Sequence, residues 1–424
     1  MIPSPYGGRL VNRQLAPHEA ERIVAQLNEL PQLRPEADQV YDAAKLAVGA
    51  YSPLDGFMDR ATLESVVHTL RLPNSLPWPI PIVLTPPGRE AKAVLDALRP
   101  GDEVALLDPT GRFFALLHFR EKYILDRSTI AQGVYGTTDE RHPNVAALWA
   151  TGSTAVAGRV DLVRPPEVPV PELEMTPAQS RELFARNGWG NVAGFQTRNV
   201  PHAGHEQLHR LALERDDVDA LFVHPIVGPL KAGDYRPDVV VEAYRAVLRE
   251  YYPEGRVALG TLSIGMRYAG PRAALFFAIV RRNYGCSHYI VGRDQAGVGS
   301  FYKPYACHQI FDEYAVGVTP LRFREMSYCS RCGLMASEKS CGHRAAVRAT
   351  TSQTRVRAAI TGGQPLPLDI LRPEVVAILS RGDSLLGPSP PGPDPAVDGP
   401  ARDPGPSEGS RSVEPTWPLP APAW

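Results

Sequence analysis

The sequence predicts an α/β fold in which a mostly β N-terminal domain precedes a parallel sheet covered by helices. Short apolar runs between turn residues fill the first 167 residues, whereas apolar strands alternate with helices after residue 168. Continuous apolar strands separated by helices are typical of a parallel sheet that is buried on both faces. The length of 424 residues and the 43% of hydrophobic residues allow two or three domains with sizeable cores.

The N-terminal domain is expected to span residues 1–167. Its hairpin is predicted by two apolar runs that flank an Asp-Pro-Thr-Gly turn. A stiff, proline-rich linker follows at 164–171. The predicted elements are helices around 17–30 and 59–70, a strand over 79–84, and the hairpin strands 103–107 and 113–117.

The second domain is expected to span residues 168–322 and to carry the functional site. Ligands of open parallel sheets bind outside the carboxyl ends of the strands. This rule selects three loops, 196–205, 224–234 and 292–299. The predicted strands are 192–195, 220–223, 257–262 and 288–291, and the helices are 201–215, 237–252 and 271–283.

The first of these loops is rich in groups that bind anions. Gln196, Thr197, Arg198 and Asn199 follow the first strand directly. Pro201 suits the first turn of a helix, which would place His202 and His205 on one face beside free backbone N–H groups. The arginine offers a bidentate fork and the histidines offer donors that can be charged. The loop therefore predicts a site for polyphosphate or sulfate.

A second motif overlaps the same helix. His205-Glu206-Gln207-Leu208-His209 matches the H-E-x-x-H pattern of zinc peptidases, with Glu206 as the base. Against this interpretation, the motif begins a helix between parallel strands, and no third ligand follows nearby. A metallopeptidase is kept as an alternative, together with a non-catalytic nucleotide-binding relative.

Several further motifs extend over most of the chain. They are YSPLDGFM (51–58), WPIPI (78–82), GMRYAGPR (265–272), NYGC (283–286) and GRDQAG (292–297). With these motifs the sequence resembles the sulfate adenylyltransferase (ATP sulfurylase) family over about residues 1–386. The resemblance implies a PUA-like N-terminal domain, a Rossmann-like nucleotidyltransferase domain, and the conversion of MgATP and sulfate into adenosine 5′-phosphosulfate and pyrophosphate.

The resemblance also implies roles for individual residues. The catalytic residues are Thr197, Arg198, Asn199, His202 and His205. Sulfate is expected to contact Gln196, Arg198 and the backbone of Ala296. The nucleotide-binding residues are Gln196, Thr197, Arg198, Asn199, Gly292, Arg293, Asp294, Gln295 and Met326, and Phe323 matches a mobile phenylalanine.

Two positions depart from the family pattern. The family usually has His where this chain has Gln295, and often His where it has Phe277. Glutamine both donates and accepts hydrogen bonds but carries no charge. In the loop 228–234, Lys231 and Asp234 also resemble a family motif, although a solvated turn would explain them equally well.

A cysteine cluster predicts a structural metal site in a small third domain, residues 323–386. Cys329, Cys332, Cys341 and His343 supply the sulfur and nitrogen ligands that tetrahedral Zn²⁺ prefers. A buried thiol cluster or a redox pair is the alternative. Because only one residue separates Cys341 from His343, the histidine is the least certain ligand.

Composition and the absence of targeting signals lead to expectations about disorder, localisation and partners. The final segment, 387–424, is rich in Pro, Gly, Ser and Asp and is expected to be disordered. No secretory signal or membrane-spanning run is visible, so we expect a cytoplasmic protein that does not bind membranes. The 45 basic and 46 acidic residues give no support for nucleic-acid binding. A homo-oligomer is expected, with Mg²⁺ entering as MgATP.

Overall fold

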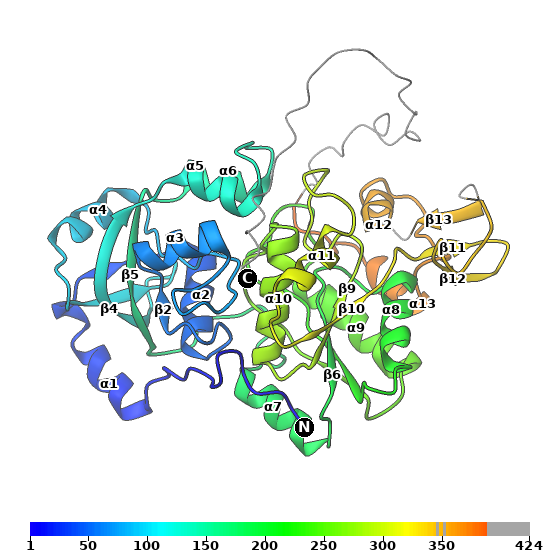
Figure 1. Ribbon diagram of the computed structural model, residues 1–424, viewed down its shortest axis with the longest axis horizontal. Coiled ribbons are helices and arrows are strands. Elements are labelled where there is room, and N and C mark those ends of the chain that lie inside the picture. The colour runs from blue at the N-terminus through cyan, green and yellow to red at the C-terminus, as the bar shows by residue number, and fades with distance from the viewer. Residues whose placement is uncertain (345–346, 351–352, 388–424) are drawn as a thin grey trace, which may run out of the picture.

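The chain folds into two lobes that lie side by side, with a small antiparallel sheet at the far edge of the second (Figure 1). The computed structural model describes residues 1–344, 347–350 and 353–387. The tail that the sequence predicts to be disordered therefore lies, from residue 388 onwards, outside the described residues.

The N-terminal lobe is built around a five-stranded sheet in the order β1-β3-β4-β5-β2. β1 pairs with β3 in parallel, and the other neighbours are antiparallel. The strands are β1 (Gln32–Leu33), β2 (Gly56–Phe57), β3 (Glu103–Leu107), β4 (Phe113–Ile124) and β5 (Thr154–Leu162). The helices are α1 (Pro17–Ala25), η1 (Leu27–Glu29), α2 (Ala37–Ala47), α3 (Arg60–Thr69), α4 (Gly88–Ala97), α5 (Arg127–Ile130), η2 (Ala131–Tyr135) and α6 (Pro143–Ala150).

The predicted hairpin is confirmed as β3 and β4, but the predicted strand at 79–84 is wrong. This segment is irregular, and only Leu84 forms an isolated bridge, to Val156. Pro79 and Pro81 have no N–H group to donate to a ladder. Ile80 and Ile82 are nevertheless buried. The apolar pattern therefore indicated buried residues correctly, but not a strand. Helices also make up more of this lobe than the mostly β expectation implies.

The second lobe contains the expected parallel sheet, in the order β10-β9-β6-β7-β8. All four pairs of neighbours are parallel. The strands are β6 (Val192–Phe195), β7 (Ala220–Val223), β8 (Val257–Leu259), β9 (His288–Val291) and β10 (Thr319–Arg322). The helices are α7 (Pro177–Arg186), α8 (Ala203–Leu213), α9 (Pro237–Tyr251), α10 (Pro271–Asn283) and α11 (Ala306–Glu313).

Alternate residues of the central strands enter two different cores. Val192 and Phe222 pack into the core that α10 shares with the N-terminal lobe. Ala193 and Leu221 pack into the core formed with α8 and α9 on the opposite face. The two-residue side-chain period of a strand produces this division, and it explains why the strands are apolar throughout.

The C-terminal segment divides between this second core and a separate small sheet. α12 (Gln353–Thr361) and α13 (Pro373–Leu379) contribute Val356 and Val375 to the core of α8 and α9. β11 (Ser327–Cys329), β12 (Leu334–Ala336) and β13 (Arg348–Thr350) form the antiparallel sheet β12-β11-β13. This sheet has only a small cluster of its own around Cys329 and Cys341.

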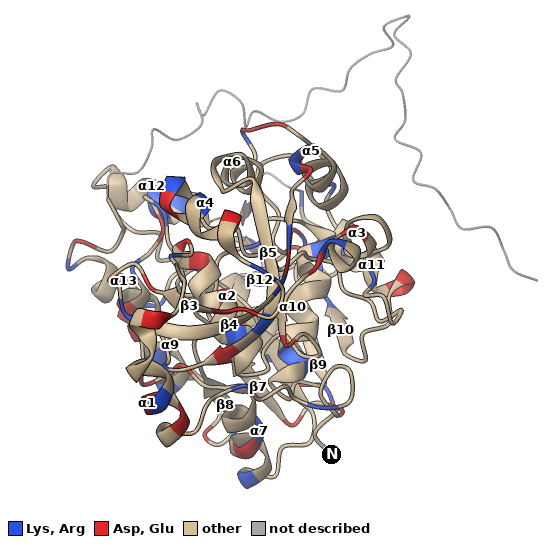
Figure 2. Cartoon of the chain, turned by 90° about the vertical axis from the view of Figure 1, so that its left-hand side faces the viewer, with Lys and Arg blue, Asp and Glu red and all other residues tan. Residues whose placement is uncertain are grey.

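On the side of the molecule that Figure 2 presents, basic and acidic residues are interspersed. Within the described ranges, no helix has the length and apolar character needed to cross a bilayer.

Two buried arginines join the lobes. Arg272, at the start of α10, donates to the backbone carbonyls of Val66, Val67 and Pro79 in the N-terminal lobe. Arg267 pairs with Asp42 of α2, and both side chains are at least nine-tenths buried. Tyr51 also donates to Asp42, at 2.8 Å. The lobes are therefore held in a fixed relation by charge-assisted hydrogen bonds as well as by apolar packing.

Removing Asp42 tests this joint. Asp42→Ala leaves the buried Arg267 without its counter-ion, and breaking such a pair costs about 3–5 kcal/mol in the free energy of unfolding. Asp38→Ala is the matched control, because Asp38 is exposed and lies 3.8 Å from the same guanidinium. We expect the control to change stability by less than about 1 kcal/mol in denaturant unfolding. Equal effects of the two substitutions would show that the Arg267–Asp42 pair contributes little.

Candidate active site

Two of the three predicted loops border one cavity at the carboxyl end of the parallel sheet. The third loop does not line the cavity but contacts Arg198, one of the residues that do. The cavity has a volume of about 280 Å³. It is bordered by the loop after β6, the loop after β9 and a segment that follows β8. The lining residues are Phe195, Gln196, Thr197, Arg198, Asn199, His205, Leu208, Met266, Tyr268, Gly292, Asp294, Gln295, Ala296 and Gly297.

The loop after β6 is held in a tight turn by its own side chain. The Thr197 hydroxyl accepts from the backbone N–H of Asn199 at 3.0 Å. The Thr197 carbonyl accepts from the N–H of Ile226, at 2.8 Å, in the loop after β7. Local hydroxyl-to-backbone bonds of this kind fix a loop without regular structure. Gln196 and Thr197 are consequently buried, and Arg198 extends to the cavity wall.

The start of α8 differs from the sequence prediction. The helix begins at Ala203, so Pro201 lies before it and His202 is its N-cap. His202 Nδ1 accepts from the N–H groups of Gly204 and His205, at 3.1 and 3.3 Å, and the N–H of Ala203 donates to the Ile370 carbonyl at 2.8 Å. The first-turn N–H groups are therefore already paired. This differs from the sequence prediction, in which they were free to hold an anion.

Burial favours the neutral form of both histidines. Their rings stack with centroids 3.8 Å apart. Burial lowers the pKa of His202 to about 4. Burial, together with the neighbouring His202 and His209, holds the pKa of His205 well below its usual value. Because desolvation disfavours the imidazolium, burial favours neutral donors and acceptors here over the charged form that the sequence also allowed.

The positive charge of the site comes from Arg198 and its surroundings. Arg198 Nη1 donates to Asp234 Oδ1 at 2.8 Å. The guanidinium carbon of Arg198 and the ammonium of Lys231 lie 5.0 and 5.3 Å from the ring centroid of Tyr268. Both distances are within the range of cation–π attraction. The structure thus brings Lys231 and Asp234 of the third loop next to Arg198, which disfavours the alternative of a solvated turn.

The loop after β9 is linked to the loop after β6 by a short chain of hydrogen bonds. Gln295 Nε2 donates to the Tyr289 hydroxyl at 3.1 Å, and that hydroxyl donates to Gln196 Oε1 at 3.2 Å. The uncharged Gln295 is thus accommodated by a neutral network. Ala296 has a φ of +56°, a left-handed conformation that is strained for a residue with a Cβ.

Three predicted nucleotide or phosphate residues do not border this cavity. His202 acts as the helix cap behind His205. Arg293 directs Nη1 to Asp294 and Glu325, at 3.2 and 3.5 Å. Met326, like Phe323, lies after β10 and is not among the residues that line the cavity.

Sequence reasoning missed residues that reach the site from other parts of the chain. Arg357 of α12 donates from Nη2 to Asn199 Oδ1 at 2.6 Å. Asn144, at the start of α6 in the N-terminal lobe, accepts from the Tyr268 N–H at 2.6 Å and donates to the Met266 carbonyl at 3.2 Å. Only Met266 and Tyr268 carried a signal, because they belong to the GMRYAGPR motif.

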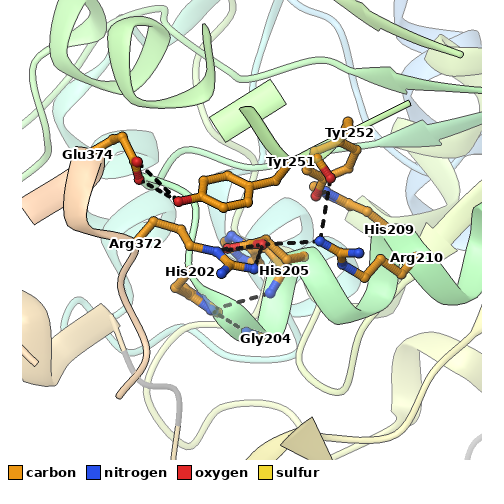
Figure 3. A network of polar contacts seen from close by, with 10 residues as sticks. His202, Gly204, His205, His209, Arg210, Tyr251, Tyr252, Arg372 and Glu374 are labelled. Atoms are coloured by element: carbon orange, nitrogen blue, oxygen red, sulfur yellow. Dashed lines mark hydrogen bonds and ion pairs between the residues drawn. The ribbon is translucent and has the colours of Figure 1, made fainter. Parts of the chain in front are cut away.

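The overlapping H-E-x-x-H motif is not arranged as a metal site. Arg372 binds both carboxylate oxygens of Glu206, with N–O distances of 2.7 to 3.0 Å, so this carboxylate cannot act as a free base. His209 Nδ1 lies 2.7 Å from the Tyr252 hydroxyl. Figure 3 shows Arg372 reaching the start of α8, and Tyr251 bonded to Glu374 on the same side. The motif helps to attach the C-terminal segment to α8.

The predicted cysteine cluster does assemble. One ligand atom from each of Cys329, Cys332, Cys341 and His343 lies within 4.8 Å of all the others. The His343 Nδ1 atom is 3.3 to 3.4 Å from the three sulfurs, and the sulfurs of Cys332 and Cys341 are 3.6 Å apart. Zn–S bonds of about 2.3 Å and Zn–N bonds of about 2.0 Å in a tetrahedron require separations of about 3.5–3.8 Å. The four residues therefore fit a tetrahedral metal ion.

Known proteins resemble this chain over most of its length. The family model described as ATP-sulfurylase matches residues 171–382, and the model described as a PUA-like domain matches residues 3–165. The second match confirms the expected PUA-like N-terminal domain. A solved structure, described as a hexameric APS kinase from Thiobacillus denitrificans, superimposes with a TM-score of 0.71 and 28% identity, covering 91% of this chain and 69% of the other.

Curated relatives agree with these matches. The sulfate adenylyltransferase of Hyperthermus butylicus is 43% identical over 90% of this chain and 96% of its own length. The sulfate adenylyltransferase of Symbiobacterium thermophilum is 43% identical over 89% of this chain and 96% of its own, and that of Aeropyrum pernix is 42% identical over 91% and 100%. With a family model that spans the whole cavity-bearing sheet and relatives matched nearly end to end, the chain belongs to the ATP-sulfurylase family.

Proposed function

We propose that the chain catalyses the sulfate adenylyltransferase reaction, in which sulfate and MgATP give adenosine 5′-phosphosulfate and pyrophosphate. A sulfate oxygen attacks the α-phosphorus, and the bond from that phosphorus to the bridging oxygen of pyrophosphate breaks. The observation that supports this most directly is the placing of Arg198, backed by Lys231, at a cavity between the loops after β6 and β9. The relatives named sulfate adenylyltransferase supply the substrate class.

The two loops divide the substrates between them. Gln196 and Arg198, with the backbone of Ala296, bind sulfate. Thr197, Asn199 and the segment 292–295 contact the ATP phosphates and ribose. The link Gln295–Tyr289–Gln196 keeps the two loops in register, so that attacking and leaving oxygens are aligned.

The reaction needs charge stabilisation more than proton transfer. Sulfate is a dianion at neutral pH and requires no general base. Two anions must approach each other in line, as in phosphoryl transfer, so fixed positive charge lowers the barrier. The guanidinium of Arg198 provides this charge, and the neutral His205, steadied by the stacked His202, donates a hydrogen bond to the pyrophosphate that leaves. Mg²⁺ enters with ATP and neutralises phosphate charge.

The proposal also includes further nucleotide contacts and an oligomeric state. Met326 reaches the adenine from the segment between β10 and β11, and Arg293 contacts the nucleotide after releasing Glu325. The solved relative from Thiobacillus denitrificans is described as a hexamer, which favours a homo-oligomer for this chain as well.

The cluster of Cys329, Cys332, Cys341 and His343 holds Zn²⁺ in a structural role. Four protein ligands leave no open position for catalysis. The ion ties the β11–β12 turn to the segment before β13, where the small sheet has few apolar contacts of its own. Metal binding of this kind contributes directly to the folding of a small unit.

The decisive experiment is exchange between labelled pyrophosphate and ATP, with and without sulfate. We expect exchange only when sulfate is present. Nucleotide binding without exchange would support the non-catalytic alternative, and chelator-sensitive peptide hydrolysis would support the peptidase.

Arg198→Ala tests the anion site. Loss of one well-aimed donor to the transition state costs about 2.7–4 kcal/mol, so sulfate-dependent exchange should fall by about 10²–10³-fold or become unmeasurable, while the thermal melt stays normal. Arg245→Ala is the matched control, because Arg245 on α9 is exposed and pairs with Glu172, at 3.2 Å. Near-normal activity of Arg198→Ala would remove this residue from the site.

Metal content tests the cysteine cluster. Protein purified without chelator should contain about one Zn²⁺ per chain, and Cys332→Ser should lose it and melt at a lower temperature, because three ligands hold the ion more weakly. Ser330→Ala, in the same turn but outside the ligand set, is the control and should retain the metal. Wild-type protein with no stoichiometric metal by elemental analysis would contradict the proposal.

A further inference from the structure

A residue from the far end of the chain reaches the candidate active site. Arg357 lies on α12, and its Nη2 donates to Asn199 Oδ1 at 2.6 Å. Its guanidinium carbon lies 5.0 Å from the ring centroid of Tyr235. Arg357 does not line the cavity itself, so any effect on substrates must pass through Asn199 or another neighbour.

A second neighbour is the carboxylate that also binds Arg198. Asp234 Oδ1 accepts from Arg198 Nη1 at 2.8 Å, and Arg357 Nη2 lies 3.8 Å from the same oxygen. The Asp234 side chain is only 8% exposed. The two arginines thus share one buried counter-ion, with the shorter contact going to the arginine that faces the cavity.

More positive than negative side chains lie around Asp234. Arg198, Arg357 and Lys231 surround this single carboxylate. Burial lowers the pKa of Lys231, and repulsion from Arg198 lowers it further. The pKa of Arg357 is also lowered, first by burial and then by Arg198. Burial contributes most to these shifts and repulsion among the cations adds to them, and an incoming oxyanion would reduce that repulsion.

Arg357 has an unused donor in this arrangement. Its Nε atom is buried and has no hydrogen-bond partner among the residues that the structure describes. An unpaired buried donor is unfavourable, so an arrangement in which Arg357 engages a carboxylate fully is favoured once that carboxylate becomes available. A guanidinium can bind a carboxylate through two parallel bonds, which the present 3.8 Å contact does not achieve.

We propose that Asp234 is a counter-ion exchanged between two arginines: it pairs with Arg198 in the empty site and passes to Arg357 when an oxyanion substrate takes Arg198. Arg357 is then a positioning residue. It keeps the Asp234 charge neutralised while the anion is bound, and it holds Asn199 in place. The inference rests on the proposed function, since it assumes that Arg198 binds the sulfate or phosphate oxygens.

The test compares sulfate binding and turnover in Arg357→Gln with the wild-type protein. Without Arg357, Asp234 keeps its close ion pair with Arg198 and competes with the anion for that guanidinium. We expect the KM for sulfate in the exchange reaction to rise about tenfold, as for loss of a hydrogen bond to a charged group, with a smaller change in kcat. Arg357→Lys retains the charge and should recover part of the sulfate affinity.

Asp234→Asn separates counter-ion exchange from a merely structural role. Without the carboxylate, no negative charge competes with the anion for Arg198, and Arg357 has no carboxylate to bind. Arg357→Gln should therefore raise the sulfate KM much less in the Asp234→Asn background than in the wild-type background. Arg355→Gln is the matched control on the same helix, because Arg355 is exposed and pairs with Asp369 at 2.9 Å. We expect it to behave like the wild type.

Several outcomes would overturn the inference. An Arg357→Gln variant with an unchanged sulfate KM contradicts it, as does an equal effect of Arg357→Gln with and without Asp234. Calorimetric titration of sulfate and of pyrophosphate gives the same comparison without turnover. A wild-type chain that lacks sulfate-dependent exchange therefore defeats the proposed function, while the binding data still decide the exchange of Asp234. If Arg357→Gln does not fold, Arg357→Lys in both backgrounds carries the comparison.

Discussion

The parallel pairing of β6 with β7 and β9 is the constraint on which the site depends. Parallel strands end at one edge of their sheet, so the loops that follow β6, β7 and β9 meet although about a hundred residues separate the first from the last. The strands remain in this register because both faces are buried, with α8 and α9 on one side and α10 on the other. Gln196 and Gln295 can therefore contact the same tyrosine, Tyr289.

Desolvation determines which side chains at the carboxyl edge of the parallel sheet carry positive charge. Burial favours the neutral form of the His202 and His205 imidazoles over the charged one, and the first N–H groups of α8 are already bonded. Arginine keeps its charge under such conditions, whereas imidazole does not. Arg198 therefore carries positive charge at this edge of the sheet, and the buried carboxylate of Asp234 balances it.

Support for the site comes from both ends of the chain. Asn144 of the N-terminal lobe fixes the backbone at Tyr268, whose ring lies against Arg198 and Lys231. From the other end, Arg357 reaches Asn199, and α12 and α13 share the core of α8 and α9. The lobes in Figure 1 are thus distinct in architecture, yet each supplies a group that positions the same cavity. Buried charge pairs such as Arg267 with Asp42 keep this relation specific.

The sequence by itself determined the alternating strands and helices of the second lobe, the polar loop 196–199 that borders the cavity, and the cysteine cluster. These features depend on local periodicity and short spacings, which a sequence displays directly. It misassigned 79–84 because a buried apolar run with prolines resembles a strand when its pairing partner is not known. Only the tertiary structure decided the neutral state of His205 and the contacts of Arg357, since burial and long-range proximity arise from packing between segments that are distant along the chain.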